Sequence, residues 1–147
     1  MKREDICIWK MLVDNRGHYV SVSDLVHVCG MSRRQLTSRM TKIGLPGVEK
    51  DETKHETYYI LDCTLDEATE LTVILLSDLY KCNPVMIQNV IDQVSANETT
   101  SLTDVCSATT FSQRDVAYIL SNAPAILMSK KGSKNRYIRI CEAGKTA

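Results

Sequence analysis

The side chains in this sequence that could do chemistry are mainly hydrogen-bond donors in two runs with the same spacing. The first run occupies residues 32–43, and the second occupies residues 112–121, 80 positions later. Arginine bonds guanine bidentately, glutamine bonds adenine, and hydroxyl groups bond phosphate or base oxygens. Such donors on two helices predict contacts to double-stranded DNA. The residues predicted to make them are Ser32, Arg33, Arg34, Gln35, Thr37, Ser38, Lys42, Gln113, Arg114 and Tyr118.

The densest cluster of positive charge follows the second run. We expect Lys130, Lys131, Lys134 and Arg136 to contact DNA phosphates beside or within the minor groove, with Arg139 continuing the cluster. The alternative is a solvated loop tip without a ligand. The corresponding segment of the first half, residues 49–56, mixes its lysines with four carboxylates, so direct contact with DNA is less expected there.

Catalytic and metal-binding patterns are absent from the sequence. The three histidines are separate, and there is no glycine-rich phosphate loop, HExxH or GxSxG motif. The six cysteines form no CxxC pair and none has metal-ligand spacing to a histidine, which favours free and mostly buried thiols. We therefore expect no enzyme activity, metal, cofactor or small-molecule effector. Without a signal peptide or membrane-spanning stretch, a cytoplasmic location is expected.

The elements that must position the donors repeat at the offset of 80. Each copy predicts a short helix after a serine or threonine cap, Ser23 or Thr103, followed by a turn at Gly30 or Thr110. Ser32 and Ser112 then cap a second helix in each copy. The apolar residues expected on the buried faces of these second helices are Leu36, Met40, Ile43, Val116, Ile119 and Leu120.

A hairpin is predicted after each helix pair. The first has strands at 48–50 and 56–61, and the second has strands at 126–128 and 136–141 around a tip at 129–135. A further helix precedes each copy, at 5–13 and at 84–94. The expected core face of the second of these helices is Val85, Val90, Ile91 and Val94.

The predicted fold is mostly α with small β-hairpin wings (α+β), as a tandem winged helix-turn-helix joined by a helix. The expected boundaries are 1–63, 64–82 for the connecting helix, and 83–147. Thr64 caps a connecting helix over 65–81, whose broad apolar surface either joins the halves or makes a homodimer. The segment that contains this helix is acidic, since residues 62–104 carry a net charge of −7. Residues 1–61 carry +2 and residues 105–147 carry +5, so a polyanion is expected to bind the two ends of the chain and not its middle.

Residues 5–80 resemble the N-terminal winged helix of DeoR-like and WYL-type transcriptional regulators. The resemblance lies in the Ser-Arg-Arg start of the second helix, the Leu-Pro before the wing, the tyrosine-rich return strand, and the acidic-aliphatic helix that follows. It implies DNA binding. Those regulators continue into a WYL or sensor domain, which we expect this chain to lack, with a second winged helix in its place.

These observations favour a sequence-specific double-stranded DNA-binding regulator of transcription that uses both second helices and the basic second wing. Two alternatives remain open. Winged helices also serve as protein-binding scaffolds in chromosome and transcription complexes, and paired winged helices occur in plasmid and viral replication initiators. A scaffold would bind a protein without needing Arg33 and Arg34, whereas an initiator would select a repeated DNA element.

Overall fold

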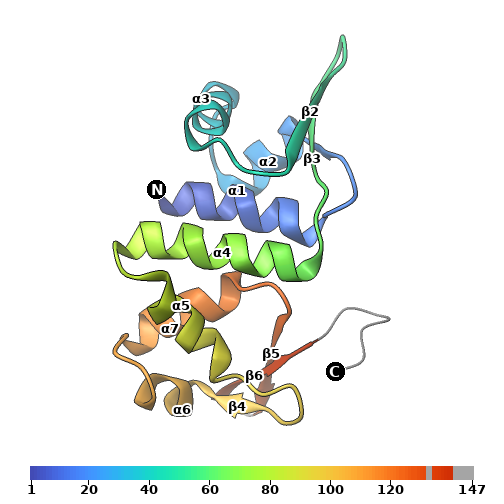
Figure 1. Cartoon of the computed structure of the whole chain (residues 1–147). Coiled ribbons are helices and arrows are strands. Elements are labelled where there is room, and N and C mark those ends of the chain that lie inside the picture. The colour runs from blue at the N-terminus through green and yellow to red at the C-terminus, as the bar shows by residue number, and fades with distance from the viewer. Residues whose placement is uncertain (132–133, 141–147) are drawn as a thin grey trace. The chain divides into compact units, whose positions relative to one another are not determined.

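The computed structural model describes residues 1–131 and 134–140, and the chain divides into two compact units, Met1–Ala68 and Thr69–Ala147 (Figure 1). Helices surround a small antiparallel three-stranded sheet in each unit. The predicted α+β class, with two winged-helix-like units joined by a helix, is confirmed. None of the described helices combines the length and apolar character that crossing a membrane requires.

The first unit contains three helices and a hairpin. Its elements are α1 (Arg3–Asp14), β1 (Val20–Ser21), α2 (Val22–Cys29), α3 (Arg33–Ile43), β2 (Val48–Glu52) and β3 (Thr57–Leu61). The sheet order is β1-β3-β2. Tyr59 of the central strand β3 lies between Val20 of β1 and Lys50 of β2. The next helix, α4 (Leu65–Tyr80), begins with a reciprocal cap between Thr64 and Glu67, as the sequence predicts for Thr64.

The second unit repeats this order. Its elements after α4 are α5 (Pro84–Asp92), β4 (Thr100–Ser101), α6 (Leu102–Ser107), α7 (Gln113–Asn122), β5 (Ile126–Lys131) and β6 (Lys134–Arg139). The sheet order is β4-β6-β5, and Thr100 lies opposite Tyr137. Since Val20 lies opposite Tyr59 in the first unit, this register aligns β3 with β6 at an offset of 78. The two hairpins are thus equivalent, but they repeat at an offset of 78, whereas the helices α3 and α7 repeat at an offset of 80.

The predicted caps of α2 and α6 were wrong by two residues. Ser21 accepts a hydrogen bond from the Asp24 N–H at 3.0 Å, and Ser101 accepts one from the Asp104 N–H at 3.2 Å. Both caps end a two-residue strand that the sequence analysis missed, so the chain passes directly from strand to helix. Gly30 ends α2 with φ 65°, in the left-handed conformation that the sequence predicts.

The buried faces follow helical spacing, with corrections in α3 and α5. Met40 and Ile43, predicted on the buried face of α3, are only half-buried, because this face is fully covered at Leu36 alone. Leu36, Val116 and Ile119 are fully buried, as predicted. Val85, however, is 70% exposed, and Ile87 is buried in its place. The reason is periodicity: one turn before Val90 and Ile91 the buried position is 87, whereas 85 points away.

The wings are longer than predicted. β2 continues to Glu52, β5 reaches Lys131 and β6 already begins at Lys134, so the basic residues lie on strands rather than in a long tip. Residues 132–133 of the predicted tip and Cys141 of the predicted strand lie outside the described residues. A homodimer through residues 65–81 stays a prediction.

Candidate nucleic-acid interface

The N-terminus of α3 uses two of the predicted contact residues for capping. The Ser32 hydroxyl accepts a hydrogen bond from the Gln35 N–H at 3.1 Å, and the Gln35 side-chain oxygen accepts one from the Ser32 N–H at 3.0 Å. This reciprocal pair satisfies two backbone donors that would otherwise lack a partner. Both side chains therefore serve to start the helix, unlike those of their neighbours along α3.

Arg33 is held by the wing. Its Nη1 and Nη2 donate to the two carboxylate oxygens of Glu56, each at 3.0 Å, in a bidentate pair. Nη2 also donates to the Ser23 hydroxyl at 2.5 Å, and that hydroxyl donates to Glu56. Ser23, which the sequence suggested as a cap, thus links three elements: the first turn of α2, the start of α3 and the beginning of β3.

This arrangement lowers the pKa of Glu56. Hydrogen bonds from Arg33, from Ser23 and from the Thr57 N–H lower the pKa of the Glu56 carboxyl from 4.5 to about 2. The Glu56 side chain is 14% exposed, whereas that of Arg33 is 56% exposed. The carboxylate therefore remains ionised at neutral pH and ties the wing to α3.

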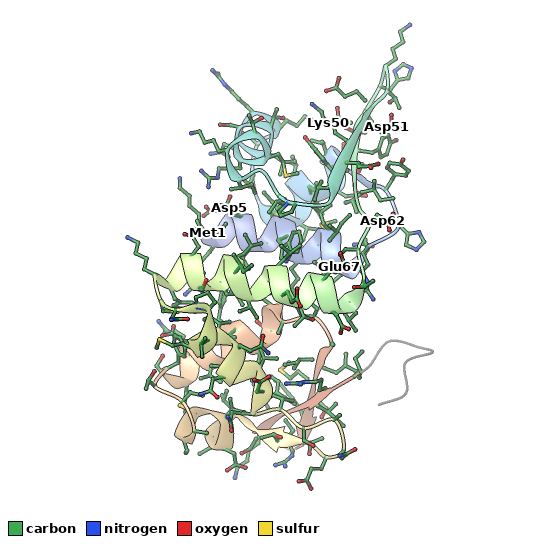
Figure 2. All side chains as sticks on the ribbon, in the orientation of Figure 1. Met1, Asp5, Lys50, Asp51, Asp62 and Glu67 are labelled. Carbon is green, nitrogen blue, oxygen red and sulfur yellow. The ribbon has the colours of Figure 1, made fainter. Side chains whose placement is uncertain are left out.

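A second arginine–carboxylate pair holds α3 from its other side. Arg39 donates to the two carboxylate oxygens of Asp5, from Nε at 2.7 Å and from Nη2 at 2.5 Å. The labelled Asp5 lies between α1 and α3 in Figure 2, and its side chain is fully buried. Burial opposes ionisation, but the Arg39 donors and the Lys2 N–H, at 2.8 Å, hold the pKa of Asp5 below 3.8.

The remaining polar side chains of α3 form one exposed face. An open groove runs along it and is lined by Arg33, Arg34, Thr37, Ser38, Thr41 and Lys42, with no carboxylate. Arg34, Ser38 and Lys42 stand four residues apart, so they form a single row. Neither Arg34 nor Lys42 has an ion pair among the described residues. This row is the exposed donor surface of the first unit, and the flanking threonine hydroxyls already donate to backbone carbonyl oxygens.

A second groove lies on the other flank of the row. It is lined by Arg34, Ser38 and Lys42 together with Lys2 and Glu4 near the start of α1 and with Gly30 in the turn. Lys2 and Thr41 were not among the contact residues predicted from the sequence. The spacing of Thr41, four residues after Thr37, is a signal that could have found it. The position of Lys2 beside α3 was not predictable from the local sequence, because it depends on how α1 packs against α3.

The equivalent helix of the second unit offers fewer free donors. Ser112 caps α7 by accepting from the Asp115 N–H at 3.2 Å, and Gln113 and Arg114 are exposed. Tyr118 is half-buried, with its ring edge-on to Tyr80 at 6.4 Å between ring centres. Of the three predicted residues on α7, only Gln113 and Arg114 are therefore fully accessible to a ligand.

The arginines of the second wing bond within their own unit. Arg136 donates to the hydroxyl of Thr99 at 2.7 Å and to its carbonyl oxygen at 3.0 Å. Arg139 donates to the Ile91 carbonyl oxygen at 2.5 Å, at the end of α5, and lies 3.5 Å from Asp92. Lys130 and Lys134 are exposed on the hairpin strands, and the Lys131 backbone pairs with that of Lys134. The exposed charge of this wing is thus carried by lysines.

Metal and thiol chemistry have little support in the part of the chain that the structure describes. It contains no group of three or more histidine, cysteine or acidic residues that could hold a metal ion. Its five cysteines are free and half-buried, rather than mostly buried as predicted. Burial and the neighbouring Cys7 raise the pKa of the Cys29 thiol to about 12, which makes that thiol a poor nucleophile.

The chain matches no family model, no curated protein and no solved structure. The resemblance to DeoR-like and WYL-type regulators therefore stays a prediction.

Proposed function

We propose that the first unit binds double-stranded DNA with α3 in the major groove, as a sequence-specific regulator of transcription. The observation that carries this proposal is the row Arg34, Ser38 and Lys42 on an exposed helix face, where the groove on the side of Thr37 and Thr41 contains no carboxylate. A recognition helix needs free donors on one face and needs to be held firmly on the other. α3 has both features.

The side chains of the row and of its flanking threonines suit different parts of the duplex. Arg34 lies in the first turn, where a recognition helix reaches base edges, and its guanidinium suits the two acceptors of guanine. The hydroxyls of Thr37 and Thr41 already donate to backbone carbonyls, at 2.9 Å and 3.1 Å, and keep lone pairs for other partners. Lys42, in the last turn, suits a phosphate.

The two arginine–carboxylate pairs support the same role. The Arg33–Glu56 pair fixes the start of α3 to the wing, and the Arg39–Asp5 pair fixes its middle to α1. A helix held at two points presents its donors in a fixed geometry, so less conformational entropy is lost on binding. In this proposal Arg33 and Arg39 position the helix, and Arg34 and Lys42 contact DNA.

The first wing is not part of the proposed interface. Glu49, Asp51 and Glu52 are exposed on β2, and Lys50 is paired with Glu52 at 2.5 Å between Nζ and Oε1. Figure 2 shows the labelled Lys50 and Asp51 on the hairpin, where Lys50 shares a small groove with Thr37 and Thr41 beside the row. Carboxylates at these positions would repel DNA phosphates. The predicted contacts of α7 and of the second wing with DNA stay predictions.

The decisive experiment compares two matched variants in a duplex-binding assay. Binding of the full chain to a random duplex library is measured at low salt, and a selected duplex is then titrated by fluorescence anisotropy. Arg34→Ala with Lys42→Ala is expected to weaken binding by about 10- to 100-fold, since a good base contact contributes about 1–3 kcal/mol. The salt slope is expected to fall by about 1 for each lost phosphate contact.

The matched control is Arg114→Ala, at the equivalent position of α7, which is expected to change affinity less than twofold. Equal losses in both variants would contradict the assignment to the first unit. Undetectable binding to the whole library at low salt would refute the DNA role and favour a scaffold.

A further inference from the structure

The second wing exposes an apolar edge that DNA binding does not explain. Leu127 and Met128 are adjacent on β5 and are 53% and 54% exposed. Neighbouring residues of a strand point to opposite faces, so both faces of the wing show an apolar side chain at this level. β5 is also the outer strand of its sheet, because the order is β4-β6-β5.

The backbone of β5 presents hydrogen-bonding groups at this edge. The Ile140 N–H donates to the Ala125 carbonyl oxygen at 2.7 Å, so the next peptide N–H along the chain points away from β6. In an antiparallel ladder every second residue then directs both its N–H and its C=O outward. The residues with outward backbone groups are Ile126, Met128 and Lys130.

The first wing has the same backbone geometry with a different surface. The Asp62 N–H donates to the Gly47 carbonyl oxygen at 3.4 Å, which places Lys50 at the outward position equivalent to Met128. Its neighbours on β2 are charged, and Lys50 pairs with Glu52. Charged side chains are a common means of preventing a strand from pairing at a sheet edge. β2 is protected in this way, whereas the first three residues of β5 are not.

We propose that the open edge of β5 is a docking site for an extended segment of a partner protein, one that is apolar in its middle and acidic at the end nearest the wing tip. Such a segment adds a strand to the sheet through the outward groups of Met128 and its neighbours. Its apolar side chains cover Leu127 and Met128. Its carboxylates lie beside Lys130 and Lys134, which are exposed on the two hairpin strands.

Charge complementarity favours this occupant over two others. A second copy that paired β5 with β5 in the antiparallel sense would set outward residues opposite each other and would place Lys130 opposite Ile126, where the ammonium has no counter-charge. A DNA backbone would match the lysines but would leave Leu127 and Met128 without an apolar partner. An acidic and apolar segment satisfies both parts of the edge.

The test uses the full chain, labelled with nitrogen-15, and two capped nonapeptides of alternating threonine and valine. One peptide ends in three glutamates and the other in three lysines. We expect the glutamate peptide to shift the amide signals of Ile126, Met128 and Lys130 at millimolar concentration, and the lysine peptide to bind at least tenfold more weakly.

Matched proline variants test the mode of binding. Met128→Pro removes an outward N–H without removing a bond to β6, and should weaken binding about fivefold, the value of one hydrogen bond. Lys50→Pro, at the equivalent position of β2, should leave affinity unchanged. If Met128→Pro does not fold, Met128→Glu keeps the backbone donor and should repel the acidic peptide to a similar extent.

Four results would overturn the proposal: no shift on β5 at millimolar peptide, equal binding of both peptides, shifts on β5 that grow with protein concentration and heavier sedimentation, or shifts on β5 with a DNA duplex alone. The proposal concerns the second unit and extends beyond DNA binding. The Arg34→Ala, Lys42→Ala variant should therefore retain the peptide response, so failure of one proposal can be told from failure of the other.

Discussion

The two units hold their equivalent helices α3 and α7 by different forces. In the first unit α3 is tied to α1 by the buried Asp5–Arg39 pair. In the second unit the position 80 residues after Arg39 is Ile119, which is fully buried. The buried residues of α1 and α5 align at an offset of 82, with Trp9 matching Ile91, so that Asp5 corresponds to Ile87, also fully buried. An ion pair in one unit thus corresponds to two isoleucines in the other.

The contact between wing and helix also differs, because an ion pair holds it in the first unit and no equivalent pair is found among the described residues of the second. Arg33 and Glu56 join α3 to the first hairpin, while the equivalent positions of the second unit are Gln113 and Lys134, which form no such pair among the described residues. The comparison teaches that a repeated fold need not repeat its surface. The first unit uses two arginines to orient its helix and keeps Arg34 and Lys42 exposed, and the second leaves Leu127 and Met128 of its wing exposed.

The largest expected effect is on the stability of the first unit. Asp5→Ala leaves the Arg39 guanidinium without its partner, and breaking a buried pair typically costs about 3–5 kcal/mol. Because Arg39 keeps some access to solvent, we expect the lower end, about 3 kcal/mol. The measurement is urea unfolding followed by the fluorescence of Trp9, the single tryptophan of the chain and a fully buried residue of α1. A loss below about 0.5 kcal/mol would show that the pair does not hold α3.

A double substitution sharpens this comparison. Asp5→Ile with Arg39→Ile gives the first unit the residues of the second, and replacing a buried ion pair by apolar residues is often neutral or stabilising. We expect the double variant to unfold within about 1 kcal/mol of the native chain. If it is as unstable as Asp5→Ala, the equivalence of the two sites is wrong.

Acid should affect the units unequally. The pKa of Asp5 lies below 3.8, and that of Glu56 falls from 4.5 to about 2. Both carboxyl groups bind fewer protons when folded than when unfolded, so their stabilisation is complete above about pH 4.5 and is lost as the pH falls towards 2. The equivalent residues Ile87 and Lys134 have no carboxyl group. Amide hydrogen exchange between pH 5 and pH 2.5 should show the first unit losing protection earlier, and equal losses would contradict the comparison.

The smallest expected effects concern the tie between wing and helix. Glu56→Gln removes the charge that binds Arg33, so amides of residues 52–57 should exchange faster while the midpoint of urea unfolding changes little. The converse change, Gln113→Arg with Lys134→Glu, introduces the pair into the second unit and should slow exchange at the start of β6. If neither wing responds, the Arg33–Glu56 pair does not restrain the hairpin.

Patterns within one element were predictable from sequence, and partnerships between elements were not. The cap at Ser32 and the buried Leu36 follow from spacing along a single helix, and the offset of 80 follows from comparing two such local patterns. The sequence also indicated that α3 is rich in donors, but it treated Arg33 and Arg34 alike. Only the placement of Glu56, 23 residues later, separates an arginine that holds the wing from one that is exposed.

The same limit applies to the second wing. Its positive charge was clear from the sequence. The hydrogen bonds of Arg136 to Thr99 and of Arg139 to Ile91 were not, because these partners lie 37 and 48 residues earlier in the chain. The short strands β1 and β4 were missed because two residues carry too little pattern. Their register with β3 and β6 depends on the folded hairpin.

The central claim is that the free donors of α3, and not those of α7, meet DNA. Amide chemical-shift mapping tests it most directly, with the nitrogen-15-labelled full chain titrated at low salt with a 20-base-pair duplex from the selected pool. We expect the largest shifts at residues 34–42, small shifts on α7, and loss of the response in Arg34→Ala with Lys42→Ala. Shifts centred on α7 or on the second wing, with α3 unmoved, would contradict the account.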